Sequence, residues 1–434
     1  MGVTMNLKIA LVSATAVGLL MATGAAYAGG GNYTYLNQAG DNQLATVNQS
    51  TGYGDSVGTG IGANSFYQND QVAGYGGNKL QIDQNSTAGI EGGWAGYMGT
   101  GSGYGNNTAT GHQSGWGNNA EIDQGGSNST VNLEQNGGHN GWVGTLGHPD
   151  SGNPWYNSLY ANIILQDWTA NYSHVSLTQN SDPGAAKGNF FSIGQGGYNN
   201  SITANQSGTN AGPDRSNDLW VRQGTAGPDL WWPDGFGSPS WVQNSTINVT
   251  QTVGVDAVNY AALAQSGGTG GNTNNAITLT QTGGANAADA SQIGSYNTFT
   301  ANQTTTDTSR FNHIGGESDF PLANGSEVNA LAAANMTLDW QHPVTQIGYD
   351  NTYLISQAGS GLGAFGTQNG TGNFLSAFQY GTLNDLFTNQ TGDNNTIDSW
   401  QQDDSNLTIV AQNGSGNHSN TVQSGTSNLA TVNQ

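Results

Sequence analysis

Residues 412–434 read QNGSGNHSNTVQSGTSNLATVNQ, and this stretch decides the fold. Glutamine stands at 412, 423 and 434, so the same amide recurs every eleven residues. The interval runs without a break through the C-terminal part of the sequence, and shorter runs of it occur upstream. The glutamines of the unbroken run are Gln346, Gln357, Gln368, Gln379, Gln390, Gln401, Gln412, Gln423 and Gln434. A fixed period of this kind indicates a repeat architecture in which each unit stacks on the next.

Each seven-residue segment that ends on a periodic glutamine has the pattern of a short strand. STVNLEQ (129–135) and NTYLISQ (351–357) are examples. Alternate side chains of a strand point to the same face. The first, third, fifth and seventh residues therefore share a face, which in 129–135 carries serine, valine, leucine and glutamine. The pattern predicts a narrow apolar stripe bracketed by two polar residues, with the opposite face in water.

Between these segments the sequence has the form Q-x-G-x-x-N, as in QYGTLN (379–384) and QTGDNN (390–395). Glycine and asparagine tolerate positive φ, so this spacing predicts a turn. Strand, turn, strand and turn then close one coil in about 22 residues, twice the eleven-residue period. The sequence therefore predicts an all-β fold, a β-solenoid of stacked strand-turn-strand coils with loop insertions.

Burial explains why the repeated polar residues are asparagine and glutamine and not aspartate and glutamate. A buried polar side chain is costly unless it is hydrogen-bonded. Carboxamides at the same position of successive coils can bond to one another as ladders, whereas carboxylates would stack like charges. The predicted ladder residues are Asn351, Gln357, Asn373, Gln379, Asn384, Gln390, Asn395, Gln401, Asn406, Gln412, Asn417, Gln423, Asn428 and Gln434.

Charge and cysteine content exclude several classes of function. Six lysines and arginines against 28 aspartates and glutamates give a net charge of −22, so nucleic acid is not an expected partner. The chain has no cysteine, which excludes disulfides and thiolate metal sites. A disordered Asn/Gln/Gly-rich tract is the compositional alternative. The constant phase of the repeat argues against it.

The N-terminus has the features of a secretory signal peptide. Lys8 precedes an apolar stretch at 9–20, and AYA (26–28) fits a small-x-small cleavage site. The apolar stretch is too short to span a membrane, and we expect no transmembrane segment in the mature chain. The expected organisation is a signal peptide (1–28), interrupted repeats with Gly/Trp-rich insertions (29–303), an insertion (304–345) and uninterrupted repeats (346–434). Insertions are expected at the turns.

The pattern Q-x-G-x-x-N-x5-Q resembles the curlin repeat, which occurs in subunits of curli, the bacterial extracellular amyloid fibres. Full matches begin at Gln113, Gln195, Gln281, Gln292, Gln346, Gln368, Gln379, Gln390, Gln412 and Gln423. The resemblance implies a β-solenoid that polymerises end to end, alone or with other curlin subunits. It also implies secretion through an outer-membrane pore and a cell-surface fibre (a pilus or curli) that serves adhesion and biofilm formation.

Some positions depart from the curlin pattern. Asp403 replaces a turn glycine, Ser129 replaces asparagine, and Leu362 stands at an asparagine position. The chain is also longer than simple curlin subunits. Its role as a major or a minor, nucleating subunit therefore stays open, as do the handedness of the coil and whether the chain polymerises alone.

The strands nearest the two ends of the mature chain are predicted assembly edges. Residues 428–434 (NLATVNQ) form a full repeat strand with Ala430 and Val432 inward, and 32–38 (NYTYLNQ) resembles it. An unpaired strand edge is a template for another chain. We therefore expect Asn32, Gln38, Ala430 and Val432 to lie at head-to-tail interfaces.

Candidate catalytic and metal-binding patterns are weak. GDSVG (54–58) fits G-x-S-x-G, but no helix follows, so a turn between coils is expected. The seven histidines show no zinc spacing, and Asp398, Asp403 and Asp404 fit a solvated turn better than a calcium site. We expect a protein that is not an enzyme and has no cofactor or metal; a carbohydrate-active β-helix enzyme is the weakest alternative.

Tryptophans gather in one of the repeat breaks, DLWWPDGFGSPSW (229–241). Exposed aromatic side chains can stack on sugars, whereas a loop folded back on the coils would bury them. The alternative function is a monomeric β-solenoid adhesin that binds surface glycans through such loops, with Trp231 as a candidate contact. The role of these insertions and the identity of a surface ligand stay open.

Overall fold

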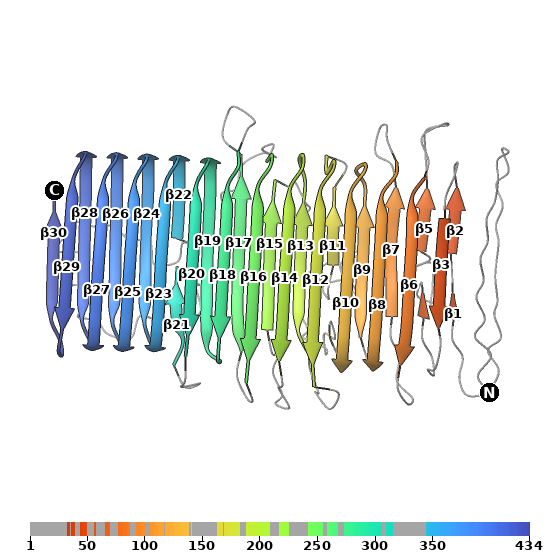
Figure 1. Cartoon of the computed structure of the whole chain (residues 1–434), viewed down its shortest axis with the longest axis horizontal. Helices are drawn as coiled ribbons and strands as arrows, with labels where there is room; N and C mark the ends of the chain where they lie inside the picture. Colours follow the sequence, from red (N-terminus) through yellow and green to blue (C-terminus); the bar gives the residue numbers. More distant parts are fainter. Residues whose placement is uncertain are drawn as a thin grey trace, which may run out of the picture. The chain divides into compact units, whose positions relative to one another are not determined.

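The computed structural model describes residues 33–34, 36–39, 44–49, 56–57, 66–69, 77–86, 93–99, 105–116, 118–138, 140, 163–167, 169–182, 188–208, 217–224, 242–254, 258–267, 273–305, 310–315 and 344–434. The expected signal peptide, Asn32 and the tryptophan-rich segment 229–241 lie outside the described residues. The chain divides into two units, Met1–Pro239 and Ser240–Gln434. All regular structure among the described residues is β-strand (Figure 1).

The strands of the first unit are β1 (Tyr33–Thr34), β2 (Leu36–Ala39), β3 (Leu44–Gln49), β4 (Ser56–Val57), β5 (Phe66–Asn69), β6 (Lys79–Ser86), β7 (Gly93–Gly99), β8 (Thr108–Trp116), β9 (Asn119–Gln124), β10 (Thr130–Gly138), β11 (Ile163–Gln166), β12 (His174–Ser181), β13 (Phe190–Gln195), β14 (Ser201–Gly208) and β15 (Asn217–Gln223). Two parallel sheets contain them. One runs β3-β6-β8-β10-β12-β14, and β7, β9, β11, β13 and β15 are consecutive in the other. Ser56 of the GDSVG segment lies in β4 and not in the expected turn.

The strands of the second unit are β16 (Thr246–Val253), β17 (Asn259–Ser266), β18 (Ala276–Thr282), β19 (Asn286–Ser295), β20 (Thr298–Thr304), β21 (Asn312–Ile314), β22 (Val344–Tyr349), β23 (Thr352–Ser360), β24 (Gly363–Thr371), β25 (Phe374–Thr382), β26 (Asp385–Asp393), β27 (Thr396–Asp404), β28 (Leu407–Ser415), β29 (His418–Ser424) and β30 (Leu429–Asn433). The sheet β16-β18-β20-β23-β25-β27-β29 is called the β16 sheet. The second, called the β17 sheet, contains β17, β19, β21, β22, β24, β26, β28 and β30.

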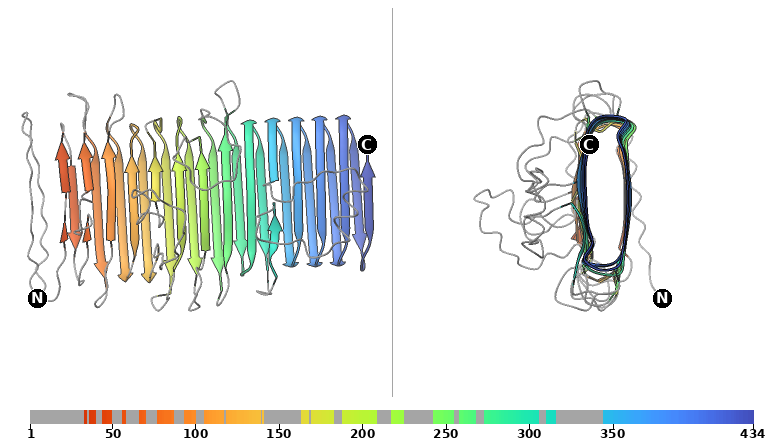
Figure 2. Two further views of the ribbon diagram at one scale, coloured as in Figure 1. Left: turned by 180° about the vertical axis from the view of Figure 1, so that it is seen from behind. Right: turned by 90° about the vertical axis from the view of Figure 1, so that its left-hand side faces the viewer.

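Successive strands of the second unit alternate between its two sheets, which appear as facing layers in the end-on view of Figure 2. Each strand pairs in parallel with the strand one coil away, and equivalent residues are aligned, as in Gln357↔Gln379 and Gln379↔Gln401. Buried side chains from both sheets, such as Leu375 and Leu386, fill the space between them. Each unit is therefore the predicted all-β solenoid.

The strands are longer and the turns shorter than the sequence pattern indicates. Strand β26 continues three residues past Gln390, so Gly392 pairs with Gly414 inside the sheet. Gly392 has a φ of +106°, and a Cβ at this position would lie 2.0 Å from the carbonyl oxygen of Gly414. Glycine is needed here because two strands approach closely at positive φ. The chain then turns at Asn394, whose φ is 56°.

The insertion expected at 304–345 spans fewer residues than expected, and it begins within a strand and not at a turn. Strand β21 (Asn312–Ile314) pairs with residues 286–288 of β19, and β22 pairs with residues 290–295 of the same strand. The two short strands are thus halves of one rung, and residues 316–343 interrupt it in mid-strand. Joined directly, Asn312 to Gly315 and Val344 to Gln346 would read NHIGVTQ, a complete N-x5-Q unit.

Candidate functional site: the amide ladders

The predicted glutamines of the β16 sheet lie in a single column. Gln357 Nε2 donates to Gln379 Oε1 at 2.9 Å, Gln379 Nε2 to Gln401 Oε1 at 2.9 Å, and Gln401 Nε2 to Gln423 Oε1 at 3.1 Å. The column extends back through Gln303, Gln281 and Gln251. All of these side chains are buried. The repeat period in the sequence is therefore a hydrogen-bonded ladder in the structure.

The β17 sheet carries an equivalent glutamine column. Its members, each donating to the next at 2.8–3.1 Å, are Gln265, Gln292, Gln346, Gln368, Gln390, Gln412 and Gln434. The first unit has the same construction, with columns Gln113-Gln135-Gln179-Gln206 and Gln124-Gln166-Gln195-Gln223.

Glutamines of both columns also join the two sheets of a coil. Gln379 Nε2 donates to the carbonyl oxygen of Gly363 at 2.8 Å and to that of Asn384 at 3.0 Å, as well as to Gln401. Gly363 begins the facing strand β24, and Asn384 ends the next turn. A carbonyl oxygen can accept a hydrogen bond but cannot donate one. These two carbonyls therefore fix which end of the amide carries the NH2 group. A carboxylate could not make these bonds.

Asparagines form a second type of ladder at the turns. Asn373 donates from both its backbone N and its Nδ2 to Asn351 Oδ1, each at 3.1 Å, and Asn395 binds Asn373 in the same way. Asn373 Nδ2 also donates to the carbonyl oxygen of Gly392 at 2.8 Å. Asn417 continues this column through its backbone N, and Asn384, Asn406 and Asn428 form the column at the opposite turn.

The two types of ladder have opposite polarity. Glutamine NH2 groups donate toward higher residue numbers, as from Gln379 to Gln401. Within the asparagine columns, each NH2 group donates to the amide oxygen at the lower residue number, as from Asn373 to Asn351. Aligned amides in one column accumulate a dipole, and the neighbouring column of opposite sense offsets it.

The departures from the repeat have local structural substitutes. The Asp403 carboxylate accepts a hydrogen bond from the backbone N of Gly425 at 2.9 Å, and Asp403 has a φ of 70°. The Ser129 hydroxyl takes the role of the asparagine amide, accepting from the backbone N of Ser173. Leu362 donates its backbone N to the asparagine of the preceding coil, but its buried side chain has no acceptor for the next one.

The structure describes three of the four predicted edge residues, namely Gln38, Ala430 and Val432. Strand β30 pairs with β28 on one side, and within it Ala430 and Val432 are half-buried. Gln38 lies in β2 opposite Gln68 of β5. Asn428 Oδ1 accepts no hydrogen bond within the described part of the chain, although the equivalent oxygen of Asn406 accepts two.

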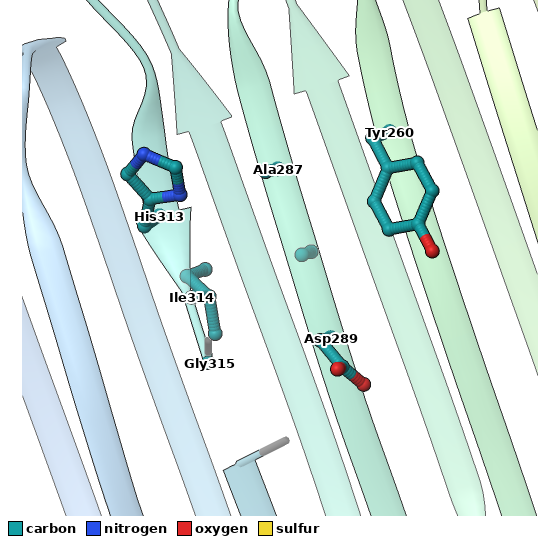
Figure 3. Close-up of a pocket in the computed structure, with 7 residues that line it drawn as sticks. Tyr260, Ala287, Asp289, His313, Ile314 and Gly315 are labelled. Atoms are coloured by element: carbon teal, nitrogen blue, oxygen red, sulfur yellow. The ribbon is translucent and has the colours of Figure 1, made fainter. Parts of the chain in front are cut away.

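A few side chains of the second unit have shifted pKa values. Burial between the sheets raises the pKa of the Tyr353 hydroxyl, and the Thr388 side chain partly counteracts this. Burial also lowers the pKa of His313 to about 4. His313 lies beside a shallow hollow on the β17 sheet, together with Tyr260 and Asp289 (Figure 3). Sequence reasoning missed this group because His313 belongs to the interrupted rung.

The described residues contain no group of three or more histidine, aspartate or glutamate side chains that could hold a metal ion. The Asp404 carboxylate instead accepts a hydrogen bond from the Thr382 hydroxyl at 2.5 Å. None of the described residues forms a helix that is long and apolar enough to cross a membrane.

Comparisons with known proteins identify one segment. No curated protein and no solved structure matches the chain. The sequence model of the curlin associated repeat matches residues 273–304. This segment holds β18, β19 and β20, with Gln281 and Gln303 bonded in one glutamine column and Gln292 in the other. The chain therefore carries a curlin associated repeat at residues 273–304.

Proposed function

We propose that this chain is a secreted structural protein that stacks, with its own copies or with other curlin subunits, into curli-like extracellular amyloid fibres. Such fibres would support cell adhesion and a biofilm matrix at the cell surface. The observation that carries the proposal is the pair of continuous glutamine ladders, in which each coil presents to the next the same donors and acceptors that it receives. A construction of this kind can continue from one chain to another.

The pairing geometry at β30 supports the proposal. Strand β28 receives β30 through parallel pairing, with Gln412 bonded to Gln434 at 2.9 Å. A coil of a second copy has the same groups as β30 and could bind to its outer edge as β30 binds to β28. Exposed backbone at a strand edge favours such an addition.

Export and a non-catalytic role belong to the same proposal. The leader at 1–28 would direct the chain to the secretory route, and a curli-type outer-membrane pore would release the mature chain. In the repeats, the buried amides are engaged with neighbouring coils and turns, which is a structural use of polar side chains.

The test compares residues 29–434 with edge variants by electron microscopy and thioflavin T fluorescence. We expect fibres from the parent chain, and we expect slower elongation from Gln423→Glu/Gln434→Glu, since a carboxylate cannot donate to the glutamine of an incoming coil. Gln402→Glu, on the outer face of β27, carries the same kind of charge change and is the control. A parent chain that stays monomeric and thioflavin-negative, or edge variants that elongate like the control, would refute the proposal.

An exposed aromatic row supports the second candidate function, a glycan-binding adhesin. On the outer face of the β16 sheet, the rings of Phe378 and Trp400 lie 4.5 Å apart, and Trp400 and Tyr380 are 46% and 54% exposed. Flat exposed rings of this kind can stack on sugars. A glycan-array signal that disappears with Trp400→Ala, from a chain that forms no polymer, would favour this function over the first.

A further inference from the structure

Two pairs of exposed tyrosines lie at turns, one pair in each unit. The rings of the first tyrosine pair, Tyr172 and Tyr198, have centroids 5.4 Å apart and an interplanar angle of 61°. Those of the second tyrosine pair, Tyr296 and Tyr349, lie 5.1 Å apart at 55°. The four side chains are 40–55% exposed. In both pairs the rings therefore contact each other and remain open to solvent.

The two pairs have the same construction. In each, one tyrosine has a left-handed backbone conformation at a turn, with a φ of 53° for Tyr172 and 60° for Tyr296. The residue just before that tyrosine pairs in parallel with the second tyrosine, which belongs to the next coil. These pairings are Asn171↔Tyr198 and Ser295↔Tyr349. Each ring contact therefore runs diagonally across one step between coils.

The left-handed position does not itself favour tyrosine. Positive φ is unfavourable for bulky side chains and is tolerated best by glycine, asparagine and aspartate. Most of the other described residues with positive φ are glycine, asparagine, aspartate or serine. Tyr172 and Tyr296 are the aromatic ones among the described residues, and both meet a tyrosine of the next coil. The recurring feature is therefore the pair of rings and not the turn.

Two exposed phenol rings in contact are suited to oxidative coupling. A peroxidase-type oxidant removes one electron and one proton from each phenol, which leaves two tyrosyl radicals. These join through a carbon–carbon bond between ring carbons ortho to the oxygens, and the hydrogen on each of these carbons moves to its oxygen as the ring becomes aromatic again. Hydrogen peroxide takes up the two electrons and two protons and becomes two water molecules. Rings that are already held together need no encounter between molecules.

We propose that the two tyrosine pairs are modification sites, at each of which such an oxidant forms a dityrosine cross-link between adjacent coils. The bonds join residues 26 and 53 positions apart in the sequence. Closing a loop restricts the unfolded chain, and a longer loop restricts it more. The second bond also connects the parts of the chain before and after residues 316–343, so a single cut there would not separate them. The proposal concerns the single chain and does not depend on fibre formation.

The test oxidises dilute, freshly desalted residues 29–434 with a peroxidase and a limiting amount of hydrogen peroxide. Dityrosine fluorescence gives the total yield, and mass spectrometry of proteolytic peptides locates the cross-links. We expect one cross-linked peptide pair for each tyrosine pair, lighter than its two separate peptides by two hydrogen atoms. In urea the rings are no longer held together, and we expect the yield of both cross-links to fall at least about tenfold.

Phenylalanine variants show which phenols react. Tyr198→Phe and Tyr349→Phe keep a ring at the turn but remove its phenol, so each should abolish its own cross-linked peptide and leave the other one unchanged. Tyr380→Phe is the matched control. Tyr380 is 54% exposed but has no tyrosine ring beside it among the described residues, so its replacement should leave both cross-links unchanged.

Three results would overturn the proposal. Cross-links to Tyr380 as frequent as those within the tyrosine pairs would show that exposure alone governs the reaction. Equal yields in buffer and in urea would show that the fold does not direct it. Oxidation of the chain without a cross-link in either pair would leave the ring contacts a purely structural feature. The comparison of buffer and urea uses the parent chain, so it decides the question even if a variant does not fold.

Discussion

Replacing Gln379 by glutamate tests whether the ladders stabilise the fold. The side chain is fully buried, its Nε2 donates to Gln401 Oε1, Gly363 O and Asn384 O at 2.8–3.0 Å, and its Oε1 accepts from Gln357 at 2.9 Å. An ionised glutamate has almost the same shape but no donor. A glutamate at 379 retains the hydrogen bond from Gln357 Nε2. It also places a carboxylate oxygen against three other acceptor oxygens, where the NH2 group donated.

The expected loss of stability is large. The two N–H groups of the amide, one of them shared between two acceptors, contribute about 2 kcal/mol at about 1 kcal/mol each, before any cost of the charge. Full burial raises the pKa of a carboxyl group by up to about 3–5 units, and each unit corresponds to about 1.4 kcal/mol at a pH where the group would otherwise be ionised. We therefore expect Gln379→Glu to lower the free energy of unfolding at pH 7 by at least about 4 kcal/mol.

The effect should depend on pH in a defined direction. The glutamate would have a pKa in the folded state above its unfolded value of about 4.3. The unfolded state therefore loses its proton first as the pH rises, and stability falls from about pH 4.3 up to the folded-state pKa. Below pH 4.3 the protonated carboxyl is neutral and has one O–H donor, so part of the stability should return.

The assay is urea unfolding of freshly desalted residues 29–434, followed by far-UV circular dichroism at pH 3.5 and pH 7. Gln402→Glu is the matched control, because Gln402 is the next residue after ladder residue Gln401 and lies partly exposed on the outer face. We expect the control to change stability by less than about 1 kcal/mol at either pH. If both glutamate variants unfolded at the same urea concentration and showed the same pH dependence, the ladder bonds could not be a main source of stability.

Three further predictions concern single residues of the second unit. Tyr353→Phe should raise the free energy of unfolding by up to about 1 kcal/mol in urea, because the hydroxyl is buried beside Thr388 without a hydrogen bond of good geometry. Gly392→Ala should lower the free energy of unfolding by about 2–4 kcal/mol, since its Cβ would lie 2.0 Å from a carbonyl oxygen. Gly416→Ala is the control: it has open space around the new Cβ but a φ of +71°, and should lower the free energy of unfolding by only about 1 kcal/mol. Burial lowers the pKa of His313 to about 4, so stability should decline as the pH falls from about 6.5 toward 4, by about 1 kcal/mol for this partly exposed ring. His313→Gln should remove that part of the pH dependence of thermal unfolding.

The sequence predicts the coil and its ladders well for a physical reason. A strand has a side-chain period of two, and a shift of one residue would move Gln379 and Tyr353 to the wet face. A regular interval of eleven therefore allows one register in which the amides and the apolar stripe are buried together. That register is the one observed, with Gln357, Gln379, Gln401 and Gln423 in one column.

Two features of the structure were hidden from this reasoning. Gly392 reads as a turn glycine, because the same residue serves a loop with positive φ and a close approach of two strands. Asn312 and Gln346 belong to one rung, but 34 positions separate them, and the rung is recognised only when residues 316–343 are removed. The remaining signal was the pair of fragments NHI (312–314) and VTQ (344–346), which are too short to stand out.

The opposed ladders also bear on how coils can add to one another. Gln379 Nε2 is held toward higher residue numbers by its bonds to two backbone carbonyls, and Asn373 Nδ2 is fixed by the carbonyl of Gly392. Neither amide can turn over without leaving a buried carbonyl unpaired, which costs about 1–3 kcal/mol each. A coil added in the same orientation meets glutamine donors with acceptors and asparagine acceptors with donors. A reversed coil would set donor against donor in one column and acceptor against acceptor in the other, so the polarity of any stack of these coils follows from the ladders themselves.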